Sequence, residues 1–118
     1  MQIDTSTKGD AVLVTLAGRF EFGTRQDYKQ VIAQIVQDGY LRLVLDLEQV
    51  TFLDSSALGL LLLTDQKFKL KQGTVGLVNP TGYVRQVLEL ANLPRVIPVY
   101  DSVEDALQAS PSQEPGLC

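Results

Sequence analysis

The sequence contains no histidine and only one cysteine, Cys118, at its last position. Without histidine, Ser-His-Asp and Cys-His catalytic groups and histidine-based metal sites are excluded. A single cysteine allows neither an internal disulfide nor a cysteine cluster for zinc. The glycine-rich loops that cradle phosphate groups, GxGxxG and GxxxxGKS or GxxxxGKT, are also missing. These absences disfavour a small enzyme, and we expect no cofactor and no bound metal.

Long hydrophobic runs are missing as well. The longest apolar stretch, residues 57–63, contains Gly59 and is far shorter than the roughly 20 residues that a membrane-spanning helix needs. Residues 1–10 are polar and lack the apolar segment of a signal peptide. We therefore expect a cytoplasmic protein that does not insert into a membrane.

Positive charge is scarce, because 10 Lys and Arg residues face 14 Asp and Glu residues, for a formal net charge of −4. Binding to nucleic-acid phosphates needs a basic patch, so nucleic acid is not an expected partner. The one basic cluster, Lys67, Lys69 and Lys71, is typical of a solvated helix face.

The pattern of the remaining residues predicts one α/β domain. Residues 11–17 are rich in β-branched side chains, and the Gly9-Asp10 turn before them predicts an antiparallel hairpin with residues 2–7. Further strands are expected at residues 41–47, 74–78 and 96–100, and helices between residues 24 and 39, at about 55–70, from 79 onward and from about 103. The order β-β-α-β-α-β-α-β-α implies a mixed sheet of about five strands, an opening antiparallel hairpin followed by β-α crossovers, and about four helices.

This domain is expected to span residues 1–108. The remaining residues, 109–118, lack hydrophobic periodicity and are rich in Pro and Ser, so we expect a disordered C-terminal tail.

The most informative stretch is residues 50–59, VTFLDSSALG, where a short apolar run ends in an acid and two hydroxyls before a leucine-rich helix pattern begins. Ser55 and Ser56 are thus predicted in the first turn of a helix, where unpaired N–H groups and the helix dipole favour negative charge. A serine there can accept a phosphate that the helix helps to hold. Taken alone, however, Asp54 or Ser55 could simply cap the helix.

The element order, LVLDL at residues 43–47 and FLDSSALG at residues 52–59 together resemble the STAS domain family, and within it the bacterial anti-sigma factor antagonists. The resemblance covers about residues 3–108. It implies that Ser55 is phosphorylated by an anti-sigma factor that is itself a serine kinase of the GHKL type. The unphosphorylated protein would bind this kinase and release a sigma factor, and a PP2C-type phosphatase would reverse the modification.

The expected partner-binding surface combines the helix start with the preceding loop at residues 18–23. Ser55 is the expected phosphorylation site, with Ser56 as the runner-up, and Asp54 either orients Ser55, contacts the kinase's metal or caps the helix. Many members have glycine where this chain has Ala57, a difference that bears on which partner is bound. Either Phe20 or Phe22 could instead pack into the core. The full expected surface is Asp54, Ser55, Ser56, Ala57, Phe20, Glu21 and Phe22.

Two other interpretations of the sequence have to be considered. Stand-alone STAS proteins also resemble accessory subunits of lipid-transport ABC complexes, in which phosphorylation need not matter. Asp46, at the end of a strand, invites comparison with the phosphoaspartate of a receiver domain. That comparison fails because no acidic pair follows the first strand and no lysine lies near the end of the last one.

Overall fold

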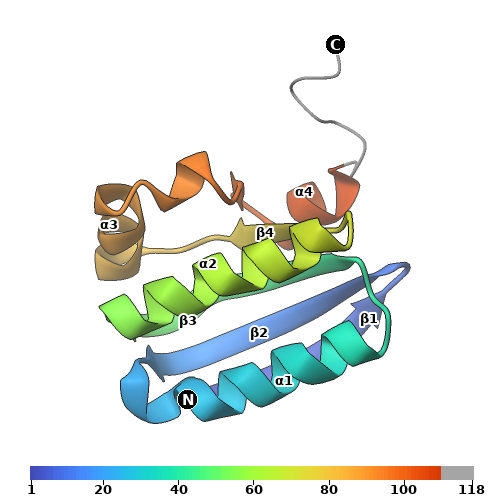
Figure 1. Ribbon diagram of the computed structural model, residues 1–118. Helices are drawn as coiled ribbons and strands as arrows, with labels where there is room; N and C mark the ends of the chain where they lie inside the picture. Colours follow the sequence, from blue (N-terminus) through green and yellow to red (C-terminus); the bar gives the residue numbers. More distant parts are fainter. Residues whose placement is uncertain (110–118) are drawn as a thin grey trace.

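The computed structural model describes residues 1–109 and shows strands and helices in the predicted order (Figure 1). Short 3-10 helices lie at Phe22–Thr24 and Leu93–Arg95. The strands and helices are β1 (Gln2–Lys8), β2 (Ala11–Phe20), α1 (Arg25–Gln37), β3 (Arg42–Leu53), α2 (Ser55–Leu70), β4 (Thr74–Val78), α3 (Gly82–Leu90), β5 (Val99–Tyr100) and α4 (Val103–Gln108).

The five strands form one sheet in the order β1-β2-β3-β4-β5. The first two strands are antiparallel and pair Ile3 with Leu16, whereas β3, β4 and β5 are each parallel to the strand before. Parallel neighbours require a crossover connection, which α1, α2 and α3 provide. The predicted mixed sheet with an opening hairpin is therefore confirmed.

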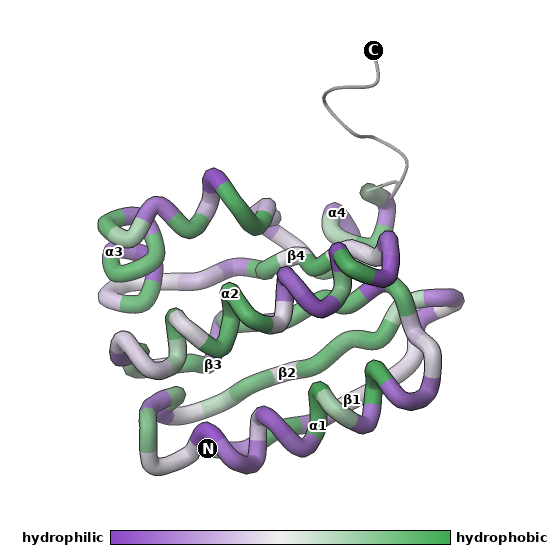
Figure 2. The backbone as a smooth tube through the Cα atoms, in the orientation of Figure 1, coloured by the Kyte–Doolittle hydropathy of each residue, from purple (hydrophilic) through white to green (hydrophobic). Residues whose placement is uncertain are grey.

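Helices α1 and α2 lie side by side on one face of the sheet (Figure 1). In α1, the buried residues Tyr28, Ile32 and Ile35 recur at helical spacing and supply its inner face. They join alternate residues of the strands in one core, and Figure 2 shows hydrophobic residues along β2 and β3 beneath the two helices. The strand residues of this core include Val12, Val14, Leu16, Leu43, Leu45, Leu47, Val75 and Leu77.

The opposite face of the sheet is covered by α4 over Val44 and Val78. Ala106 supplies the buried helix contact. The arrangement has two layers and a partial third layer. The start of α2 lies at the end of the sheet where β3 ends.

Several predicted boundaries were wrong. Residues 18–20 continue β2 instead of forming a loop, and residues 42–53 are one strand that includes the Val50–Leu53 segment. Strand β5 has two residues, not five, because Pro98 has no N–H to give to the sheet. Helix α3 starts at Gly82 after Thr81, since Asn79 takes a left-handed conformation (φ +54°) that cannot open a right-handed helix.

The predicted disordered tail lies outside the described residues except for Ala109. Within residues 1–109, no helix has the length and apolar character needed to cross a membrane.

Candidate functional site

The start of α2 is organised by the carboxylate of Asp54, the N-cap residue. Its backbone is extended (φ −113°, ψ −178°), and its Oδ1 accepts the N–H of Ala57 at 2.9 Å. The other oxygen, Oδ2, accepts the N–H of Phe22 at 3.0 Å. One carboxylate thus satisfies a free N–H of the helix and joins the helix to the loop after β2.

Ser55 is the first residue of α2 and is exposed, whereas Ser56 is half-buried. Within residues 1–109, no hydrogen bond involves the hydroxyl of either serine, because Asp54 already performs the capping. The interpretation in which Ser55 itself caps the helix is therefore wrong. Its hydroxyl lies open to an approaching molecule.

Ala57 does not belong to an outer surface. Its side chain is 0% exposed and packs in the core, since the third position of α2 turns toward the sheet. The prediction that it contacts a partner is corrected: an alanine methyl here fills core space beneath Ser55.

The two phenylalanines of the preceding segment have opposite environments. Phe20 is 0% exposed, pairs with Leu53 in the parallel ladder and packs against Tyr28 with ring centroids 4.8 Å apart. Phe22 is 62% exposed, because the chain leaves the sheet after Phe20 and turns into a 3-10 helix. The expectation that Phe20 is accessible to a partner is therefore wrong, whereas Phe22 is exposed beside the start of α2.

Glu21, between the two, is half-buried and stabilises the turn. Its N–H donates to Thr24 Oγ1 at 3.1 Å, and its carboxylate accepts Arg19 Nε at 2.9 Å. This charged hydrogen bond raises the pKa of the Arg19 guanidinium above its ordinary value. Arg19 is therefore a fixed positive charge, and its partner Glu21 is engaged within the loop.

Two cation–aromatic contacts that the sequence analysis missed border the site. The guanidinium of Arg25 lies 4.0 Å from the ring centroid of Phe22. On the sheet face turned away from α1 and α2, Arg19 lies 4.2 Å from the ring centroid of Phe52, which stacks on Tyr83 at 5.8 Å and 10°. The register that pairs Arg19 with Phe52 depends on two irregularities in the β2–β3 ladder, and no sequence signal announces them.

The outer face of α2 continues away from Ser55 with small and apolar side chains. Gly59 is exposed, and Leu63 is 52% exposed one turn further along. Leu62 also lies at the surface. The helix start is thus followed by an uncharged strip made of Ser55, Gly59, Leu62 and Leu63.

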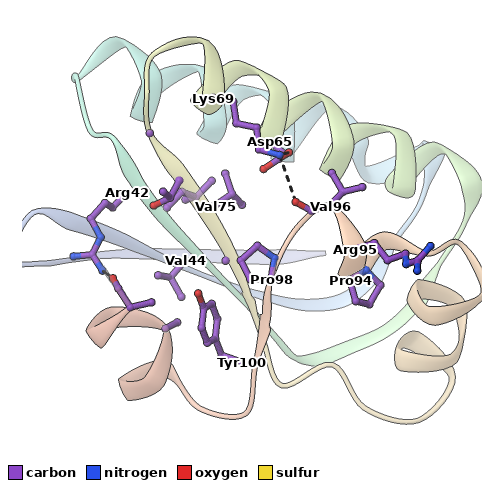
Figure 3. Close-up of a pocket in the computed structure, with 16 residues that line it drawn as sticks. Arg42, Val44, Asp65, Lys69, Val75, Pro94, Arg95, Val96, Pro98 and Tyr100 are labelled. Atoms are coloured by element: carbon purple, nitrogen blue, oxygen red, sulfur yellow. Dashed lines mark hydrogen bonds and ion pairs between the residues drawn. The ribbon is translucent and has the colours of Figure 1, made fainter. Parts of the chain in front are cut away.

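A cavity of about 440 Å³ lies at the other end of the sheet, near the N-terminal ends of β3 and β4 (Figure 3). It is lined by Asp65, Lys69, Arg42 and Tyr100, among others, and by neither serine of the predicted site. Asp65 is buried and pairs with Lys69 at 2.8 Å, and Lys69 also donates to the carbonyl of Val96 at 3.4 Å (Figure 3).

No metal-binding cluster accompanies these features in the described part of the chain. Residues 1–109 contain no group of three His, Cys, Asp or Glu side chains placed to hold a metal ion. What the arrangement at the start of α2 can do chemically is present a nucleophilic hydroxyl and apolar side chains to another molecule.

Comparison with known proteins connects this geometry to a family. Residues 2–106 match the STAS domain family. A STAS-domain containing protein of Pseudomonas aeruginosa is 32% identical over 94 residues, which cover 80% of this chain and 92% of that protein. An anti-sigma F factor antagonist of Paenibacillus polymyxa is 25% identical over 108 residues, covering 91% and 92%.

Solved structures agree with the sequence relatives. The crystal structure of an anti-sigma factor antagonist from Mycobacterium paratuberculosis matches with a TM-score of 0.81 at 29% sequence identity and covers 90% of each chain. The resemblance inferred from residues 43–47 and 52–59 is therefore confirmed, and this chain belongs to the STAS domain family.

Proposed function

We propose that this protein is an anti-sigma factor antagonist, a regulatory binding module and not an enzyme, and that phosphorylation of Ser55 switches its binding. The observation that carries the proposal is the hydroxyl of Ser55, which is exposed at the first position of a 16-residue helix and has no hydrogen-bond partner within residues 1–109. The names of the relatives from Paenibacillus and Mycobacterium support the same function.

The partner in this proposal is an anti-sigma factor that is a GHKL-type serine kinase. It transfers the terminal phosphoryl group of ATP to Oγ of Ser55, whose proton is released, and ADP leaves. Transfer in line with the leaving oxygen needs a hydroxyl that the kinase can surround, which the exposure of Ser55 allows. Ser56 is half-buried, so it is the less accessible acceptor.

Binding in the unphosphorylated state uses the surface around the helix start. Asp54, Ser55, Ser56, Glu21 and Phe22 supply it, and the uncharged strip extends it along α2. Phe22 is the natural anchor, because exposed aromatic side chains are enriched among the residues that dominate interface energies. Occupation of the kinase by this surface releases the sigma factor.

Phosphorylation reverses the binding by changing charge. A phosphoryl group adds about −1.5 to −2 charges beside the neutral hydroxyl of Ser56, the ring of Phe22 and the uncharged strip. Asp54, the adjacent residue, is itself acidic. About 1.4 kcal/mol of repulsion or lost desolvation weakens affinity tenfold, so no change of fold is required. A PP2C-type phosphatase restores the neutral serine and with it the binding.

The proposal is tested by incubating the protein with a purified GHKL-type anti-sigma kinase and ATP and mapping the phosphate by mass spectrometry. We expect one phosphate on Ser55, no incorporation in Ser55→Ala and unchanged incorporation in Ser56→Ala, the matched control one position away. Incorporation that persists in Ser55→Ala and disappears in Ser56→Ala would assign the switch to Ser56. A kinase that binds this chain without modifying either serine would contradict the proposal.

A further inference from the structure

We propose that Arg25 is the cation that receives the phosphoryl group of Ser55, and that it leaves the ring of Phe22 to do so. The inference rests on the proposed function only in taking Ser55 as the modified residue. It adds a second effect of phosphorylation: the cation that covers the exposed aromatic anchor is removed.

Arg25 and Ser55 hold the same place in two neighbouring helices. Strands β2 and β3 run parallel and end side by side at Phe20 and Leu53, so the helices that follow them start at the same end of the sheet (Figure 1). Arg25 is the first residue of α1, and Ser55 is the first residue of α2. Packed helices lie about 8–10 Å apart, a separation that an arginine and a phosphoserine side chain can span together.

A chain of contacts already links the two positions. The N–H of Phe22 is bound to the carboxylate of Asp54 at 3.0 Å, which holds the loop beside Ser55. The guanidinium of Arg25 lies 4.0 Å from the centroid of the Phe22 ring. Phe22 thus contacts both Arg25 and Asp54, the residue that precedes Ser55.

The neighbouring Arg19 is already committed. It donates to both carboxylate oxygens of Glu21, at 2.9 and 3.4 Å, and its guanidinium also lies over Phe52. Arg25, in contrast, forms no ion pair within residues 1–109. Arg85, in α3, pairs with Glu89 at 3.8 Å. Within residues 1–109, Arg25 is therefore the arginine of the region around Ser55 whose charge is uncompensated by a carboxylate.

A phosphoryl dianion is the stronger partner for such a guanidinium. The ring of Phe22 attracts the cation only through its quadrupole, at an exposed site where water competes. Phosphate oxygens accept two parallel N–H bonds from arginine and carry full negative charge. The carboxylates in this region, on Asp54, Glu21 and Asp27, repel a phosphoryl group. Its stabilisation therefore depends on the N–H groups at the helix start and on Arg25.

Movement of Arg25 changes what a partner meets at Phe22. Before phosphorylation the ring carries a cation on one face, and the pair presents a mixed apolar and positive surface. After phosphorylation the positive charge leaves the ring, and Arg25 offsets about one charge of the phosphoryl group, so that a net negative charge remains beside Phe22. The switch therefore reaches beyond Ser55 to the aromatic residue that we propose as the anchor.

The test uses the full chain with phosphoserine incorporated at position 55 during synthesis, so that no kinase is needed. Phosphorus NMR follows the second ionisation of the phosphoryl group with pH. A nearby guanidinium favours the dianion, so we expect a titration midpoint about half a pH unit or more lower than in the Arg25→Gln variant. Arg25→Lys should recover part of this shift, and Lys29→Gln, one turn further along α1, should leave the midpoint unchanged.

Proton NMR supplies a second readout in the same samples. The side-chain protons of Arg25 should show the ring-current shift of Phe22 in the unmodified protein and lose it in the phosphorylated one. Equal titration midpoints in the native sequence and Arg25→Gln would overturn the inference. Because the phosphoserine is incorporated without a kinase, that result leaves the proposed function standing, whereas a kinase that ignores Ser55 defeats the function and not the arginine contact.

Discussion

The two ends of β3 differ in whether a key polar side chain nearby is hydrogen-bonded within the fold. At the N-terminal end, Arg42 donates to Asp10 at 2.8 Å and to the carbonyls of Leu107 and Ala109 at 2.7 and 2.9 Å, so its donors are used within the fold. The C-terminal end lies roughly 35 Å away, the length of twelve extended residues. There the hydroxyl of Ser55 is exposed and has no partner among residues 1–109. Arg42 thus stabilises the domain, whereas the hydroxyl of Ser55 remains open to solvent.

The largest effect on stability is expected at the C-terminal end, where Phe20 is buried and Phe22 is exposed. Phe20→Ala removes a fully buried ring and should lower the free energy of unfolding by about 3–5 kcal/mol, because a cavity remains. Phe22→Ala should change it by no more than about 0.5 kcal/mol, as a surface substitution does. Urea denaturation followed by circular dichroism measures both.

The affinity for the kinase should depend more on Phe22 than on Phe20, which reverses the order of their effects on stability. Phe22→Ala keeps the fold and should lose at least about tenfold in affinity, equal to about 1.4 kcal/mol, if Phe22 anchors the partner. An affinity equal to that of the unchanged protein would remove Phe22 from the surface. Leu41→Ala, an exposed apolar residue at the opposite end, is the matched control.

The second prediction concerns the N-terminal end. Arg42→Ala removes a mostly buried guanidinium that links β3 to the end of α4, and should cost about 2 kcal/mol of unfolding free energy by the usual worth of hydrogen bonds to a charged group. Phosphorylation of Ser55 by the kinase should proceed at an unchanged rate. If Arg42→Ala kept full stability but slowed phosphorylation of Ser55, the N-terminal end of β3 would influence the site at its C-terminal end, contrary to this prediction.

A smaller loss is expected for Asp54→Ala, which removes the N-cap of α2. Substitution of an N-cap acid typically costs about 1 kcal/mol, and the N–H of Phe22 loses its acceptor as well. Asp54→Asn keeps a side-chain oxygen and should recover most of the stability. The amide resonance of Phe22 in an NMR spectrum should shift in the alanine variant, and an unmoved resonance would contradict the bridging role.

The smallest effect concerns Tyr28, whose hydroxyl contacts Thr64 Oγ1 at 2.8 Å between α1 and α2. Tyr28→Phe should cost only about 1 kcal/mol, because Thr64 still donates to the carbonyl of Leu60 at 2.7 Å. Burial raises the pKa of Tyr28 above its ordinary value, so the native state resists ionisation. Stability from this group is present below about pH 10 and lost as the pH rises further, since the unfolded chain ionises first.

Above about pH 10, the free energy of unfolding should therefore fall less steeply with pH in Tyr28→Phe than in the native sequence. Unfolding midpoints measured in urea between neutral and strongly alkaline pH reveal the difference. If the native sequence and the variant lose stability in parallel, the ionisation of Tyr28 does not contribute.

Much of the fold follows from local signals in the sequence. Residues 11–17 and 42–47 lie in strands because their apolar runs are too dense for one helix face, and Tyr28, Ile32 and Ile35 recur at helical spacing. Asp54 followed by two serines marked the start of α2 correctly, since an N-cap needs only its own side chain and the next turn. Such features depend on neighbours in the sequence and can therefore be predicted.

The rest depends on contacts between distant segments. Whether Phe20 or Phe22 is buried is decided by how far β2 continues along β3, and the alternation of two aromatic residues does not fix that length. Leu62 lies at the surface because two helices share one face of the sheet, which leaves the leucine-rich α2 with more apolar side chains than it can bury. The bond from Asp54 to Phe22 joins residues 32 positions apart and has no local signal.

The most direct measurement compares the affinity of a GHKL-type anti-sigma kinase for the unmodified protein and for the same chain carrying phosphoserine at position 55, by isothermal titration calorimetry. We predict tight binding of the unmodified protein and binding at least about tenfold weaker after modification, a loss of about 1.4 kcal/mol or more. The same phosphoserine placed at position 56 should weaken binding less. Equal affinities for the unmodified protein and the protein modified at Ser55 would contradict the charge switch at the start of α2.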